Sequence, residues 1–173
     1  RDYELHDLRR QVGVVLQDVF LFAGDIQRNI RLGESGIDTA RVQAAARLVG
    51  ADRFIARLPQ GYASPVSERG STLSVGERQL LSLARVLAFD PAILVLDEAT
   101  SSVDTETELQ VQAALHRVLE GRTALVVAHR LSTIQDCDRI LVLHRVRLRE
   151  NGTHAELLRQ RCRYSRLYEL QFL

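Results

Sequence analysis

The sequence predicts a mixed α/β fold, with a mostly parallel sheet flanked by helices and a helical segment inserted between two strands. Apolar runs of strand length, ILVL at 93–96 and TALVVA at 123–128, alternate with longer amphipathic segments in the C-terminal half. Residues 25–90 contain helical periodicity and no convincing strand, which predicts the insertion. A chain of 173 residues is long enough for one domain with a sizeable core.

The N-terminal part is expected to contain one strand followed by helices. Residues 11–17, QVGVVLQ, are rich in Val and end on Gln17, after a polar segment at 1–10 of helical or irregular character. Asp38 is expected to cap a helix over 39–49, with three residues on its apolar face: Ala40, Ala44 and Leu48. A shorter helix is expected over 52–57.

The middle of the chain is expected to change from a loop to a helix. Residues 61–74 contain Gly, Pro, Ser and Thr, which indicates an exposed loop. A helix is then expected from Val75 to about Phe89, with an apolar stripe of Leu80, Leu83, Ala84 and Leu87. Asp90 and Pro91 end this helix, and the strand at 93–96 follows immediately.

The C-terminal part is expected to alternate between helices and strands. A helix is expected over 106–119, with an inward face of Leu109, Ala113 and Val118, and Gly121 is expected to end it. The remaining elements are a strand over 123–128, a helix over 131–135, a strand over 139–143, a weak strand over 146–149, a helix over 153–160 and two amphipathic turns over 164–170.

Two adjacent carboxylates follow the strand at 93–96, which we expect to be buried on both faces as in a helix-covered parallel sheet. Ligands of such sheets bind beyond the carboxyl ends of the strands, where Asp97 and Glu98 stand. Because successive strand residues point in opposite directions, one acid can hold a metal while the other acts on a water. The alternative is an ordinary loop or helix cap after a core strand.

Three predicted strands end on polar groups: Gln17, the pair Asp97 and Glu98, and His129. If these strands are neighbours, the groups converge on one edge of the sheet. A metal ligand, a general base, a water-orienting amide and an imidazole together suit hydrolysis of a phosphoanhydride.

The helix that opens at Ser74 predicts an anion site. Ser74 can cap the helix, Gly76 allows close approach to the backbone, and the first-turn N–H groups with the helix dipole suit a terminal phosphate. The alternative is a plain capping box between Ser74 and Glu77. The place of this helix, directly ahead of the strand that ends in Asp97, favours the anion site.

Composition excludes several classes of protein. All 23 basic residues are Arg, so the phosphate-binding loop GxxxxGK[ST], which needs Lys, cannot occur in this chain. The apolar runs are too short for a membrane span. A net charge of +1 argues against a nucleic-acid partner. Because the chain opens on Arg1 and contains no Met, we expect a fragment whose natural N-terminus lies upstream.

In order and spacing, the sequence resembles the C-terminal two thirds of an ABC transporter nucleotide-binding domain of the exporter type. LSVGERQLLSLARVLAFDP at 73–91 resembles the LSGGQ signature, and ILVLDEATSSVD at 93–104 resembles Walker B with the D-loop. VVLQDVFLFAGDIQRNI at 14–30 is similar to the Q-loop, VVAHRLSTI at 126–134 to the switch-histidine loop, and SERG at 67–70 to the exporter X-loop.

The resemblance implies a role in ATP hydrolysis for each polar strand end. Asp97 would hold Mg²⁺ through water, and Glu98 would be the general base for the attacking water. Gln17 would sense the Mg²⁺ and the water, and His129 would contact the γ-phosphate of ATP. Asp104 would communicate across a dimer.

The resemblance also implies a second nucleotide-binding domain, in a homo- or heterodimer that sandwiches two ATP molecules head to tail. Ser74, Gly76 and Glu77 belong to the segment that would meet the nucleotide of the opposite subunit. Val75 and Glu77 stand where the family usually has Gly and Gln, which adds bulk and negative charge near the anion site. His144 and Val146 also depart from the family, so we expect a distorted or shortened hairpin there.

The resemblance implies a partial RecA-like P-loop NTPase core, at 1–24 and 91–173, with an α-helical subdomain at 25–90. A transmembrane domain would contact Gln17 and the X-loop residues Glu68, Arg69 and Gly70, at the cytoplasmic face of the plasma (inner) membrane. Because Walker A is missing, the fragment alone is expected to be inactive. The alternatives are a soluble ABC ATPase without transport, and a non-catalytic interaction fragment.

Overall fold

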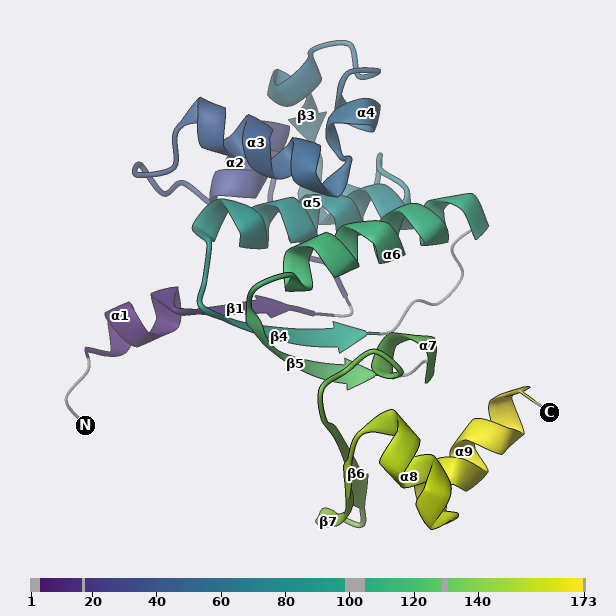
Figure 1. Cartoon of the computed structure of the whole chain (residues 1–173). Helices are drawn as coiled ribbons and strands as arrows, with labels where there is room; N and C mark the ends of the chain where they lie inside the picture. The colour runs from purple at the N-terminus through teal and green to yellow at the C-terminus, as the bar shows by residue number, and fades with distance from the viewer. Residues whose placement is uncertain (1–3, 17, 99–104, 129–130, 173) are drawn as a thin grey trace. The chain divides into compact units, whose positions relative to one another are not determined.

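A computed structural model describes residues 4–16, 18–98, 105–128 and 131–172 (Figure 1). The chain divides into two compact units, Arg1–Val127 and Ala128–Leu173. Each unit has its own cluster of buried apolar side chains. Strands and helices follow one another along the chain, so the predicted α/β class is confirmed.

One sheet contains three strands, β1 (Val12–Val15), β4 (Ile93–Glu98) and β5 (Thr123–Ala128), in the order β1-β4-β5. β1 and β4 are parallel, with Val12 opposite Ile93 and Val15 opposite Leu96. The arrows of all three strands point the same way in Figure 1. The predicted parallel sheet is therefore confirmed, and the carboxyl ends of β1 and β4 lie at the same edge.

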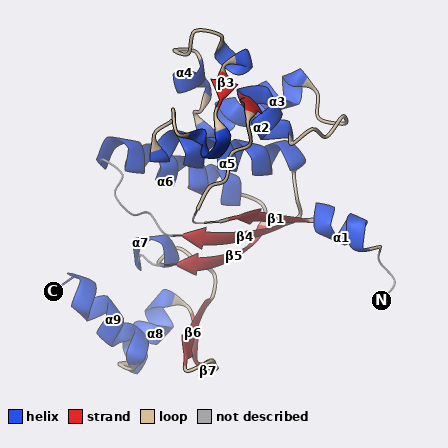
Figure 2. Ribbon diagram, turned by 180° about the vertical axis from the view of Figure 1, so that it is seen from behind, coloured by secondary structure: helices blue, strands red, loops and turns tan. Residues whose placement is uncertain are grey.

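Helices cover one face of this sheet. A short helix, α1 (Leu5–Arg10), precedes β1, while α5 (Val75–Phe89) and α6 (Thr105–Leu119) lie next to the strands. Beyond these two lie α2 (Ile26–Arg31), α3 (Thr39–Val49) and α4 (Asp52–Ile55), as both views show (Figures 1 and 2). The expected helix over 75–89 is confirmed, and its predicted stripe, Leu80, Leu83, Ala84 and Leu87, is buried.

The strand β4 is buried on one face only, so the expectation of burial on both faces was wrong. Leu94 and Leu96 are almost fully buried, whereas Ile93 is 41% exposed. Val14 on β1 and Leu125 on β5 are also exposed. The reason is that the helices α2 to α6 all lie on one side of the sheet (Figure 2).

Two helices bury a different face from the one predicted. In α3 the expected face of Ala40, Ala44 and Leu48 is exposed, and the buried residues are Val42, Ala45, Ala46 and Val49. In α6 Leu109 and Ala113 are exposed, whereas the expected Val118 is buried together with Val111 and Ala114. Both helices pack against α5, and this packing decides which residues at helical spacing are buried.

The segment 61–74 is more ordered than the predicted exposed loop. It contains two single turns of 3₁₀ helix, Gly61–Ala63 and Glu68–Gly70, and a strand β3 (Pro65–Val66). β3 pairs antiparallel with β2 (Gly24–Asp25), so the region 25–90 does contain a short strand pair. Ser64, Val66 and Leu73 are buried. This segment therefore packs into the helical part of the first unit.

The second unit contains a hairpin and two principal helices. Its elements are α7 (Leu131–Ile134), β6 (Ile140–His144), β7 (Arg147–Gly152), α8 (His154–Gln160) and α9 (Arg163–Phe172). The hairpin carries a register shift at Val142 and Leu143, and its turn residues Arg145 and Val146 have φ of 49° and 59°. The expected distortion is present, although the strands are not shortened. None of the described helices is both long enough and apolar enough to cross a membrane.

Candidate functional site

The two predicted carboxylates end the middle strand of the sheet. Asp97 and Glu98 are the last residues of β4, and Asp97 is partly buried. β1 ends beside them, because Val15 lies opposite Leu96. The backbone thus brings the end of the strand before Gln17 to the same edge as the two acids. Gln17, Asp104 and His129, and the side chain of Glu98, lie outside the described residues.

One carboxylate at a strand end fits a magnesium site that is completed by a phosphate ligand. In the described ranges, no three or more His, Cys, Asp or Glu side chains gather as they would to hold a metal by themselves. Mg²⁺ usually keeps several waters and is held by one or two carboxylates together with substrate phosphates. Asp97 can therefore supply the protein's share of such a site.

The first turn of α5 contains a capping box. The N–H of Glu77 donates to Ser74 Oγ at 3.2 Å, and the N–H of Ser74 donates to Glu77 Oε2 at 2.9 Å. The alternative that the sequence left open is therefore present, and the Ser74 hydroxyl is already an acceptor. No acceptor in the described part of the chain pairs with the N–H groups of Val75 and Gly76. These two N–H groups remain as donors for an anion.

The Glu68–Gly70 turn lies against the segment that follows Gln17. The N–H of Arg69 donates to the carbonyl oxygen of Leu21 at 2.9 Å. Gly70 has φ of 64°, and a Cβ on it would lie 2.7 Å from Leu21 Cδ1. Glycine is therefore favoured there on two grounds, the left-handed backbone and the close contact. The two segments that were predicted to meet a membrane domain lie side by side.

Two aromatic residues mark this surface, and the sequence did not single them out. Phe20 and Phe22 are 44% and 51% exposed, and their rings lie edge to face with centroids 5.0 Å apart. Large exposed apolar side chains next to each other are typical of a binding surface. The signal available in the sequence was the run VFLF between Gln17 and the next helix.

Asn29 fixes the segment that carries these rings. It is 1% exposed, its Oδ1 accepts from the N–H of Phe22 at 2.8 Å, and its Nδ2 donates to the carbonyl oxygen of Phe22 at 2.8 Å. Nδ2 also donates to the carbonyl oxygen of Asp25 at 3.0 Å. A buried amide with all of these partners determines the course of the chain from Phe22 to Asp25.

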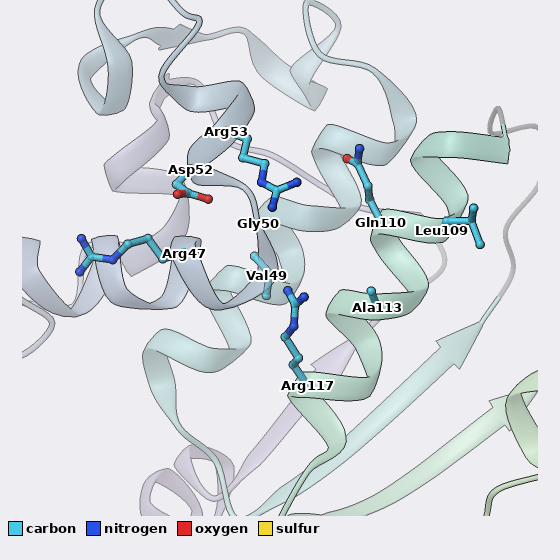
Figure 3. A pocket seen from close by; sticks show the side chains of 9 residues that line it. All are labelled: Arg47, Val49, Gly50, Asp52, Arg53, Leu109, Gln110, Ala113 and Arg117. Carbon is cyan, nitrogen blue, oxygen red and sulfur yellow. The ribbon is translucent and has the colours of Figure 1, made fainter.

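A groove of about 390 Å³ lies elsewhere in the first unit, between the end of α3, the start of α4 and one face of α6. Figure 3 shows Arg53 and Arg117 extending toward each other across it, with the exposed Leu109 at one side. None of the predicted site residues lines this groove. The groove therefore has no part in the predicted hydrolysis chemistry.

Comparison with known proteins identifies the family. The model of the ABC transporter family matches residues 1–101. The chain belongs to the ABC transporter family. The exporter-type resemblance and the RecA-like fold are supported by a solved structure described as a bacterial Atm1-family ABC exporter with ATP bound. That structure has a TM-score of 0.86 and 46% identity, over 96% of this chain and 29% of that one.

Curated relatives of this ABC protein are similar over nearly its whole length. It is 52% identical over 172 residues to an uncharacterized ABC transporter ATP-binding protein, YknV, of Bacillus subtilis, and covers 28% of that protein. It is 49% identical to an ATP-dependent lipid A-core flippase of Syntrophus aciditrophicus, over 99% of this chain and 29% of the flippase. The chain therefore spans less than a third of the length of these relatives.

Proposed function

We propose that this chain is part of the ATP-hydrolysing domain of an ABC exporter, and that ATP hydrolysis by two such domains drives export through a membrane domain. The observation that carries the proposal is the position of Asp97 and Glu98 at the end of the middle strand β4. The ends of such strands are where α/β proteins of this kind bind ligands. The relatives, which are named as ATP-binding transport proteins, support it.

The proposed chemistry divides the work between the two acids. Asp97 would hold Mg²⁺ through water, and the metal supplies positive charge to the phosphate oxygens when bound. Glu98 would take the proton from the water that attacks the γ-phosphate of ATP. Gln17 would orient that water, and His129 would contact the γ-phosphate. These roles follow from the motif positions in this sequence.

The signature segment would serve the nucleotide of a second copy or of a related domain. The N–H groups of Val75 and Gly76 have no partner among the described residues, which suits contact with a phosphate group. Ser74 would add its hydroxyl and Asp104 would connect the two sites. Glu77 would stay in its capping box, where its carboxylate is bonded to the N–H of Ser74.

A surface next to the X-loop would contact the membrane domain. Gln17 would contribute from one segment, and Glu68, Arg69 and Gly70 from the other. The bond from Arg69 to Leu21 and the exposed ring of Phe20 support a shared surface of these two segments. A protein assembled in this way would lie at the cytoplasmic face of the plasma (inner) membrane.

The experiment that tests this function is ATP turnover by the full-length protein to which we assign the chain, here called the parent protein. The purified parent protein in lipid vesicles should release phosphate from ATP when Mg²⁺ is present and not when it is chelated. The 173-residue chain alone should show no turnover, because it contains no Lys for the phosphate-binding loop. A parent protein without turnover would contradict the proposed function, and turnover by the chain alone would contradict the need for the missing loop.

A further inference from the structure

The guanidinium group of Arg85 connects three segments that are distant in the sequence. Arg85 lies on α5, and its Nε donates to the carbonyl oxygen of Asn29 at 2.9 Å. Its two terminal nitrogens both donate to the carbonyl oxygen of Phe20, at 3.3 Å each. Asn29 is on α2, and Phe20 is three residues after Gln17. One side chain therefore holds α5, α2 and the Gln17 segment together.

This arginine is a half-buried cation whose partners among the described residues are backbone carbonyl groups. Burial lowers its pKa, and no carboxylate in the described part of the chain raises it again. The two ion pairs found among the described residues, Arg10–Glu34 and Arg122–Asp90, do not include it. Removing a charge from water without an opposite charge is costly. The guanidinium group is planar and rigid, and its N–H donors form a fork that fixes the direction of each carbonyl group.

The segment from Phe20 to Phe22 is held from several sides. Arg85 holds the carbonyl group of Phe20, Asn29 holds both backbone groups of Phe22, and the N–H of Arg69 holds the carbonyl group of Leu21. Leu21 itself is fully buried. Of these attachments, only that of Arg85 comes from α5, the helix whose first turn contains Ser74 and Gly76.

We propose that Arg85 is a positioning residue that makes the Gln17 segment and the signature end of α5 move as one body. This inference rests on the proposed function, in which the first turn of α5 meets a nucleotide and the Gln17 segment meets the membrane domain. Through Arg85, a displacement of α5 is transmitted to Phe20 and Phe22. Loss of the fork removes the hydrogen bonds from α5 to Phe20 and leaves those from Asn29 of α2 and Arg69 of the X-loop.

The first test is amide hydrogen exchange in the full-length parent protein, with Arg85→Gln and Arg85→Lys as variants. Peptides that cover 18–28 should exchange about tenfold faster in Arg85→Gln, while peptides over 39–49 keep the rate of the unchanged protein. Lys keeps the charge but donates to fewer carbonyl groups at a time, so its effect should be intermediate. Arg122→Gln is the control, because Arg122 also donates to a backbone carbonyl and pairs with Asp90, away from this segment.

The second test is the steady-state kinetics of ATP hydrolysis by the same parent proteins. Arg85→Gln should lower kcat about tenfold and leave KM for ATP within twofold, because the nucleotide contacts are unchanged. The proposal would be overturned if amide exchange in 18–28 were as slow in both Arg85 variants as in the unchanged protein. It would also be overturned if exchange became faster by the same factor in 18–28 and in 39–49. If the unchanged parent protein hydrolyses no ATP, the proposed function fails, and the exchange experiment still tests the connection made by Arg85.

Discussion

Glu98→Gln in the parent protein is expected to abolish ATP turnover almost completely while ATP binding persists. The substitution keeps the size of the side chain and removes its ability to take a proton from the attacking water. Loss of a positioned general base typically lowers a rate by about 10²–10⁴-fold. Since Asp97 and the rest of β4 are unchanged, affinity for ATP should stay within a few-fold. The measurements are phosphate release and equilibrium binding of radiolabelled ATP.

The matched control for this substitution is Glu120→Gln. Glu120 is an exposed acid just after α6, at a distance in sequence from every predicted site residue. The control variant should hydrolyse ATP at the rate of the unchanged protein. Turnover of Glu98→Gln within twofold of the unchanged rate would remove Glu98 from the role of base.

Gly13→Ala is expected to destabilise the sheet more than Gly36→Ala destabilises the turn in which Gly36 lies. A Cβ on Gly13 of β1 would lie 2.6 Å from Pro91 Cγ, 3.1 Å from Val86 Cγ1 and 3.2 Å from Leu94 Cδ2. The proline ring cannot rotate out of the way, so β1 must shift against β4 or α5. Overpacking of this kind costs about 1–3 kcal/mol in the free energy of unfolding. Urea denaturation of the 173-residue chain, followed by circular dichroism, measures it.

Gly36→Ala provides the comparison. Gly36 lies in an exposed turn, and the nearest atom to its added Cβ would be Glu34 Oε1 at 3.7 Å. The change should alter the free energy of unfolding by less than about 0.5 kcal/mol. Equal urea midpoints for the two variants would show that β1 is not confined between Pro91 and Leu94 as described.

Local signals in the sequence predicted most elements of the fold. Asp38 caps α3 as expected, with its side chain accepting from the N–H of Arg41. The capping box of Ser74 and Glu77 defines the start of α5, and Pro91 follows its end. Caps and breakers act through neighbours in the sequence, so they can be recognised without the tertiary structure.

The faces of helices and the connections between distant segments were harder to predict. Leu109 was expected in the core, yet it is 65% exposed, because α6 packs on α5 through the stripe that includes Val111 and Val118. Arg85 is one arginine among 23 basic residues, and its partners lie 56 and 65 positions away. No periodicity or spacing in the sequence indicates a hydrogen bond between residues so far apart along the chain. The sequence correctly placed Asp97 and Glu98 at the end of a strand, whereas it did not single out Asn29 and Arg85.

Mixed dimers of the parent protein test most directly whether the acids of one copy work with the signature of the other. Two changes are distributed in two ways: Ser74→Arg on one copy with Glu98→Gln on its partner, or both changes on one copy beside an unchanged partner. In a head-to-tail dimer, the first arrangement keeps one complete site and the second keeps none. ATP turnover should therefore survive only when the changes are on different copies. Turnover that survives only when both changes are on the same copy would contradict the account.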